Sequence, residues 1–72
     1  MSKPIEVTVK VENTEYNITA TTVFGVRSQL AEELNVDPND ILLSCLGIKL
    51  CLNMDLEDLD AHNCWHCTVQ NH

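Results

Sequence analysis

The segment from residue 36 to residue 50 constrains the fold of this chain most strongly. Pro38 fixes its own φ and drives Asp37 out of the helical region, so these two residues form a corner. An apolar run of strand length follows at residues 41–43, a Leu-Gly turn signal at 46–47, and a second short strand pattern at 48–50. The segment is therefore expected to connect a helix to two strands of a sheet.

The chain upstream of this segment predicts a β-hairpin followed by a helix. Residues 5–11 and 16–20 alternate apolar and polar side chains, with a polar turn at 12–15, which indicates two strands with one dry face. Apolar residues then recur at helical spacing between 22 and 34. Thr21 or Thr22 can cap the start of that helix, and Asn35 can end it in a left-handed conformation.

The chain downstream predicts one helical turn and a last strand. Asp55 can cap a turn at residues 56–59, and residues 64–70 carry the last apolar run, with Cys67 and Val69 on one face. Trp65 in this run is open to two interpretations, a lid over the edge of the core or an exposed binding anchor. Two early strands, one helix and later strands predict a single two-layer α+β domain covering residues 1–72.

Several positions resemble the ubiquitin-like β-grasp family. The matching residue types run without a gap from the helix cap onward, and they comprise Thr22, Val23, Val26, Arg27, Leu30, Pro38, Leu43, Gly47, Leu50, Leu56 and Asp58. The resemblance implies an α+β fold with a mixed sheet of four to five strands and one helix packed across it. It also implies a non-enzymatic module that binds ubiquitin-receptor domains, proteasome-type domains or another domain of its parent chain.

The end of the sequence departs from the conjugated members of that family. The last residues are Gln70, Asn71 and His72, without the two glycines that conjugation requires. We therefore expect the N-terminal domain of a larger protein, coupling that protein to the ubiquitin–proteasome system. A modifier whose glycine tail lies beyond this sequence remains an alternative.

The binding surface implied by the resemblance is remodelled in this chain. The family's apolar patch positions fall on Ser44, Thr68 and Gln70, so the apolar character is expected to pass to Leu42 and Ile48. The candidate binding residues on one sheet face are Leu42, Ser44, Gly47, Ile48, His66, Thr68 and Gln70. Leu46 falls at a turn position with a left-handed backbone, which strains a leucine.

The cysteines provide a second hypothesis, a small zinc-binding domain. Cys64 and Cys67 form a C-x-x-C pair, and Cys45 and His62 could complete a tetrahedral ligand set. The same spacing also superficially matches a redox dithiol. Residues three apart on a strand point to opposite faces, however, so Cys64 and Cys67 would diverge unless a turn brought them together. The resemblance implies that Cys45 and Cys67 lie inward on neighbouring strands, where they would be buried as small hydrophobic residues.

Composition narrows the remaining function classes. A net charge of −7 on 72 residues disfavours binding to nucleic acid or to an anionic membrane. No phosphate-binding glycine motif is present, and the acidic clusters are expected to be solvated, so we expect no enzyme and no cofactor. Four cysteines without an apolar leader indicate free thiols and a cytoplasmic or nuclear location. We also expect the domain to be a monomer in isolation.

Overall fold

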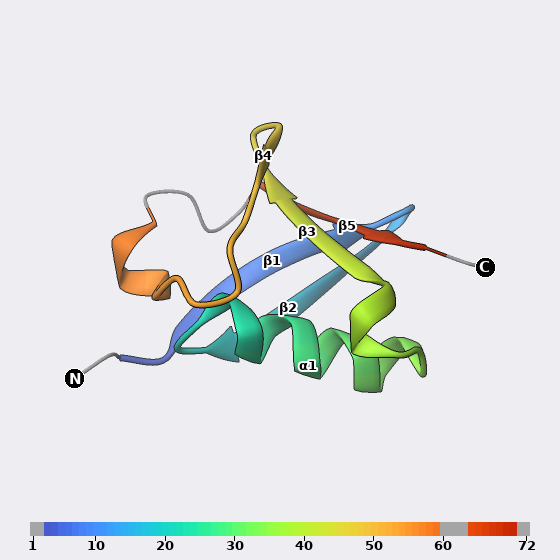
Figure 1. Ribbon diagram of the computed structural model, residues 1–72, viewed down its shortest axis with the longest axis horizontal. Coiled ribbons are helices and arrows are strands. Elements are labelled where there is room, and N and C mark those ends of the chain that lie inside the picture. Colours follow the sequence, from blue (N-terminus) through green and yellow to red (C-terminus); the bar gives the residue numbers. More distant parts are fainter. Residues whose placement is uncertain (1–2, 60–63, 71–72) are drawn as a thin grey trace.

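The computed structural model describes residues 3–59 and 64–70, which form a five-stranded sheet with one α-helix across it (Figure 1). The elements in chain order are β1 (Ile5–Val11), β2 (Thr14–Ala20), α1 (Val23–Leu34), the 3₁₀ turn η1 (Pro38–Asp40), β3 (Ile41–Cys45), β4 (Ile48–Lys49), η2 (Leu56–Asp58) and β5 (Trp65–Val69). The strand order is β2-β1-β5-β3-β4. Central strands β1 and β5 are parallel and the other pairs antiparallel, so the sheet is mixed as expected.

The first hairpin has a tighter turn than the sequence predicted. The polar residues Thr14 and Glu15 belong to β2, where they pair with Val11 and Lys10. The expected turn at 12–15 was therefore too long, because solvent-facing strand positions accept polar side chains as readily as a turn does. The real turn is made by residues 12 and 13, and Glu12 adopts the positive φ of 55° that short hairpins commonly need.

Helix α1 begins and ends where the sequence predicted. The Thr22 side chain accepts a hydrogen bond from the backbone N–H of Gly25 at 3.2 Å, which satisfies one of the unpaired donors of the first turn. Asn35 closes the helix with φ 56° and ψ 47° and donates to the carbonyls of Ala31 and Glu32. The corner follows directly, with the Asp37 side chain accepting from the N–H of Asn39.

The core lies between α1 and the inner face of the sheet. The buried residues come from every layer and comprise Val7, Val9, Val11, Ile18, Val23, Val26, Leu30, Ala31, Ile41, Leu43, Cys45, Leu50, Leu56, Trp65 and Cys67. Trp65 is only 1% exposed, so it is buried as the first interpretation expected, and it is part of the core rather than an exposed binding anchor. Cys67 is buried in the same core and Val69 is partly buried against it, so the predicted shared face of the last strand is confirmed.

The segment between β4 and η2 is tied to the start of the helix by backbone hydrogen bonds. Val23 donates to Met54 at 3.1 Å, Phe24 donates to Leu52 at 3.0 Å, and Leu56 donates to the carbonyl of Thr21 at 2.9 Å. Asp55 precedes η2 as expected, but its side chain makes no capping hydrogen bond there. These contacts hold the segment beside the helix, where its apolar residues can line surface depressions.

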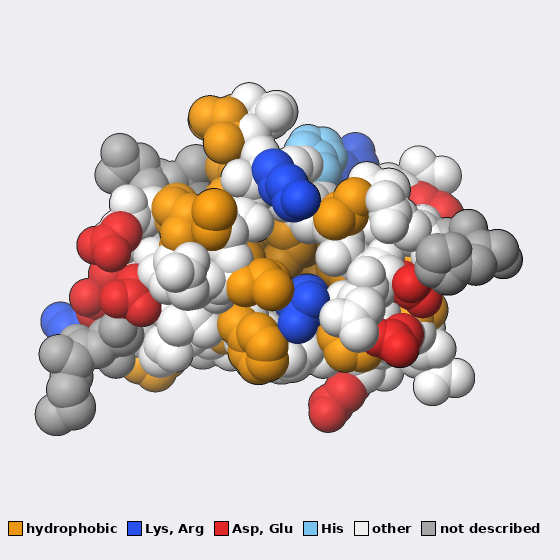
Figure 2. Space-filling model, viewed as in Figure 1, with side chains coloured by type: hydrophobic (Ala, Val, Ile, Leu, Met, Phe, Trp, Pro, Cys, Tyr) orange, Lys and Arg blue, Asp and Glu red, His pale blue; other side chains and the backbone are white. Residues whose placement is uncertain are grey.

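The surface is predominantly acidic, and Figure 2 shows acidic side chains at both ends of the face it presents, with hydrophobic and basic side chains between them. Within residues 3–59 and 64–70, no helix has the length and apolar character needed to cross a membrane.

Candidate protein-binding surface

Strands β3 and β5 bring most of the predicted binding residues together on the outer face of the sheet. Leu42 pairs with Thr68 and Ser44 pairs with His66, and residues directly opposite in an antiparallel pair share one face. Their neighbours Leu43 and Cys67 are buried on the inner side, which assigns these four side chains to the outer side. This face is largely polar, with Leu42 as the one large apolar side chain among the four.

Gln70 continues from β5, and its backbone N–H donates to the carbonyl of Asp40 at 2.7 Å. This bond anchors the end of the last strand beside the corner that precedes β3. Gln70 is exposed, so it extends the polar outer face.

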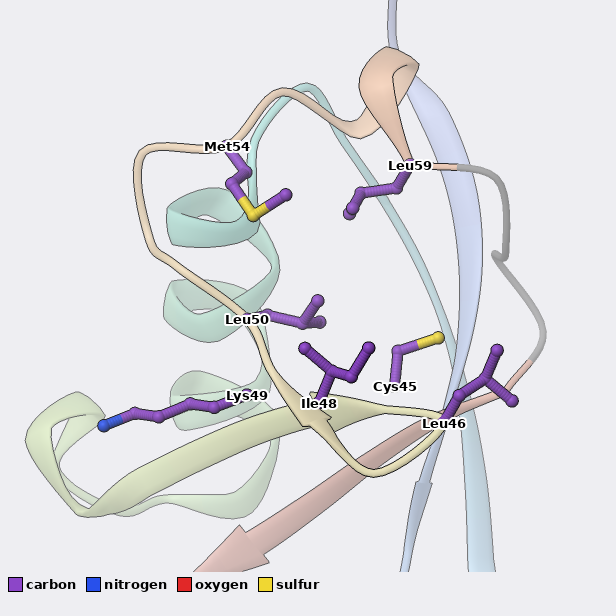
Figure 3. Close-up of a pocket in the computed structure, with 7 residues that line it drawn as sticks. All are labelled: Cys45, Leu46, Ile48, Lys49, Leu50, Met54 and Leu59. Atoms are coloured by element: carbon purple, nitrogen blue, oxygen red, sulfur yellow. The ribbon is translucent and has the colours of Figure 1, made fainter.

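Ile48 does not share the outer face, so its predicted placement there was wrong. It pairs with the buried Cys45, and its side chain therefore projects to the inner side of the sheet. The error arose because β4 is a two-residue edge strand, in which a shift of one position reverses the face of every side chain. Figure 3 shows Ile48 and Cys45 projecting into the same space.

That space is an apolar pocket of about 300 Å³ between the β3–β4 hairpin and the segment that leads to η2. It is lined by Cys45, Leu46, Ile48, Lys49, Leu50, Met54 and Leu59 (Figure 3). Leu46 is 71% exposed and Ile48 is 68% exposed, so both stand at the mouth of the pocket. We call the six apolar residues among these, all but Lys49, the hairpin patch.

The turn that presents the hairpin patch is strained, as the sequence predicted. Leu46 has φ 54° and Gly47 has φ 82°. A left-handed backbone costs a non-glycine residue about 1–2 kcal/mol, and such strain persists where the surrounding structure enforces it. Leu46 was noted in the sequence for this strain alone, and Met54 and Leu59 were missed. The sequence signal that could have indicated this patch was the Leu46-Gly47 turn with an apolar residue on each side, Cys45 and Ile48.

The structure does not favour the zinc hypothesis. Within the described residues, no group of three His, Cys, Asp or Glu side chains is placed to hold a metal ion. Cys64 is exposed whereas Cys67 is buried, so the two thiols of the C-x-x-C pair point to different environments. His62, the fourth candidate ligand, lies outside the described residues.

All four thiols are free, and the two buried ones are held in the protonated state. Burial raises the pKa of Cys67, and burial together with the nearby Cys64 thiol raises the pKa of Cys45. A zinc ligand or a redox nucleophile must be a thiolate. The raised pKa values therefore agree with the prediction that both residues pack as small hydrophobic side chains.

Comparison with solved structures decides the fold. The structure superposes on the N-terminal ubiquitin-like domain of the 4931431F19Rik protein with a TM-score of 0.81 and 22% sequence identity, over 100% of this chain and 80% of that one. The chain adopts the ubiquitin-like β-grasp fold. The same ubiquitin-like fold is found in Caldiarchaeum subterraneum ubiquitin, with a TM-score of 0.82 and 15% identity over 97% of this chain and 98% of that one.

A third ubiquitin-like neighbour is a computationally designed protein based on the template of human erythrocytic ubiquitin. It matches with a TM-score of 0.74 and 18% identity, over 100% of this chain and 95% of that one. No protein-family model and no curated protein matches the sequence. The predicted β-grasp architecture is thus confirmed by structural similarity. Sequence identities this low establish the fold, but they do not identify a partner.

Proposed function

We propose that this ubiquitin-like domain is a non-enzymatic protein-interaction module that links its parent protein to ubiquitin–proteasome machinery. The observation that carries the proposal is the pair of exposed apolar side chains, Leu46 and Ile48, beside an apolar pocket of about 300 Å³. Exposed apolar groups around a cavity with polar surroundings are typical of protein-binding sites. The partners we propose are ubiquitin-receptor or proteasome-type domains, or another domain of the parent chain.

The docking surface in this proposal combines the hairpin patch with the adjoining outer face. The pocket accommodates an apolar anchor from the partner, and Lys49 is the charged residue in its lining. Ser44 and His66 lie on the opposite face of the sheet, so a partner reaches them by wrapping around the β4 edge. Gly47 carries no side chain at the tip of the turn, which leaves room for a partner backbone to approach. Free cysteines support a parent protein in the cytoplasm or the nucleus.

The proposal is tested by titrating the chain with a panel of ubiquitin-receptor domains in a calorimeter and repeating each titration with Ile48→Ser. Since Ile48 is 68% exposed, covering it in a complex contributes about 1–2 kcal/mol, which corresponds to a 5- to 30-fold weaker Kd in the variant. Glu15→Ser is the control, because Glu15 is exposed on β2, the edge strand at the opposite side of the sheet from β4.

The expected result is a weaker complex for Ile48→Ser and an unchanged one for Glu15→Ser. Binding to none of the receptor domains, or equal affinities for wild type and Ile48→Ser, would contradict the proposal.

A further inference from the structure

A second depression lies on the flank of α1, between the helix, β3 and the segment that follows β4. It has a volume of about 200 Å³ and is lined by Arg27, Asn39, Ile41, Leu42, Leu43, Lys49, Leu50 and Leu52. A shallower depression adjoins it through the shared Leu52 and is lined by Thr22, Phe24, Leu52 and Asn53. We call the surface formed by Phe24, Arg27, Leu42, Lys49 and Leu52 the helix-flank groove.

The helix-flank groove combines exposed apolar side chains with basic ones. Phe24, Leu42 and Leu52 are all exposed large hydrophobic residues, and they come from three different segments of the chain. Apolar area of this kind, bordered by charged groups, marks a surface that a partner covers. The hairpin patch is separate, since only Lys49 and Leu50 line both depressions.

The charge of the groove is opposite to that of the molecule. The chain has four Lys and Arg residues against eleven Asp and Glu, yet two of the four, Arg27 and Lys49, line this groove. No acidic residue is among the described residues that line either depression. The depression on the other flank of α1 is different, because it is lined by Glu15, Glu32 and Glu33.

Figure 2 shows hydrophobic and basic side chains in the middle of the face and acidic ones mainly toward its ends, with a further basic side chain at the left end. An anionic ligand is therefore directed toward the middle of this face by repulsion from both ends.

Arg27 is set up to bind a carboxylate. Its guanidinium lies over the Phe24 ring, 5.2 Å from the ring centroid, which orients the planar group. Its Nε is shielded from solvent and has no hydrogen-bond partner among the described residues. A carboxylate of a partner cannot reach the shielded Nε in this conformation, so it would pair with the terminal nitrogens of the guanidinium.

We infer that the helix-flank groove binds a short acidic segment of a partner protein. Carboxylates of the segment pair with Arg27 and Lys49, and its apolar side chains pack on Phe24, Leu42 and Leu52. This surface is additional to the hairpin patch, so one domain can hold two protein segments at once. Charge complementarity favours an anionic partner. A short acidic peptide fits better than nucleic acid, because its apolar side chains can cover those of the groove, whereas a long phosphate backbone would also meet the acidic surroundings.

The probe is a ten-residue peptide of alternating glutamate with leucine or phenylalanine, titrated into the ¹⁵N-labelled chain and followed by NMR. We expect saturable shifts at the backbone amides of residues of the groove, and weaker binding as salt is raised from about 0.05 to 0.5 M. A peptide with glutamine in place of every glutamate is expected to bind at least about tenfold more weakly.

Single-charge variants of the protein assign the effect to the groove. Lys49→Gln is expected to raise the Kd for the glutamate peptide about 2- to 5-fold. Arg27→Gln is expected to raise it about 10-fold or more, since Arg27 is half-buried. Lys10→Gln is the matched control, because it removes the same charge from an exposed position on β1 outside the groove. The control is expected to leave the Kd unchanged.

Four outcomes would overturn the inference. They are absence of saturable binding, equal binding of the glutamine peptide, equal losses in Lys10→Gln and Lys49→Gln, and shifts at the groove that appear on concentrating the chain without peptide, which would make a second copy the occupant. Ile48→Ser is expected to bind the peptide normally. The inference and the proposed function therefore fail independently of each other.

Discussion

Replacing Trp65 with alanine is expected to remove a large part of the stability of this domain. The side chain is 1% exposed and belongs to the central strand β5. A buried tryptophan covers about 150–250 Å², which at about 25 cal/mol per Å² contributes roughly 4–6 kcal/mol as an upper estimate. Measured truncations of this kind cost about 3–5 kcal/mol, cavity included. For 72 residues the total free energy of unfolding is about 4–11 kcal/mol.

The assay is urea unfolding followed by far-UV circular dichroism, because the variant has lost the chain's single tryptophan as a fluorophore. Trp65→Ala should unfold at a much lower midpoint or be unfolded without urea. Ile48→Ala is the comparison, since a residue 68% exposed should lose less than about 1 kcal/mol. A free energy of unfolding for Trp65→Ala within about 1 kcal/mol of that of the wild type would refute the placement of this residue in the core.

Three further predictions concern backbone strain, helix capping and thiol ionisation. Glu12 has a φ of 55°, and Glu12→Gly should raise the free energy of unfolding by about 0.5–1 kcal/mol. The reason is that relief of about 1–2 kcal/mol of backbone strain exceeds the entropy cost of a glycine. A lower urea midpoint for the variant would contradict this. Thr22→Ala removes the hydrogen bond that caps the helix at Gly25 and should lower the free energy of unfolding by about 1 kcal/mol. In calorimetry this corresponds to a fall in Tm of about 4–8 °C, and an unchanged Tm would show that the cap adds no stability. The pKa values of Cys45 and Cys67 are raised in the folded chain, so the unfolded chain loses these protons first as the pH rises, and the free energy of unfolding should fall above about pH 8.5. The fall should be smaller in Cys67→Ala. Parallel curves of unfolding free energy against pH for the variant and the wild type would argue against buried neutral thiols.

The sequence predicted the fold because its local signals agree with one another. Apolar alternation, the Thr22 cap, the Asn35 stop and the Pro38 corner each specify an element through short-range physics, and the same positions match the ubiquitin-like pattern. The turn of the first hairpin was misjudged because Thr14 and Glu15 are polar in either setting. Only the pairing partner across the strand decides between strand and turn there.

The candidate surface was harder to predict because it depends on register at a sheet edge. The outer-face positions in β3 and β5 follow from long alternating runs, so Leu42 and Thr68 were placed together correctly. The two-residue strand β4 has no such run, and Ile48 was assigned to the wrong face. Met54 contributes to the pocket through a loop whose path is set by backbone hydrogen bonds to the helix, and no local pattern predicts such a path.

The most direct test of the account is an NMR titration of the ¹⁵N-labelled chain with an unlabelled ubiquitin-receptor domain. Docking at the hairpin patch predicts that the largest amide shifts occur at Leu46, Ile48 and Met54, with smaller ones at Ser44 and His66 on the adjoining outer face. Shifts concentrated on the acidic flank between β2 and α1, with the β3–β4 hairpin unchanged, would contradict it.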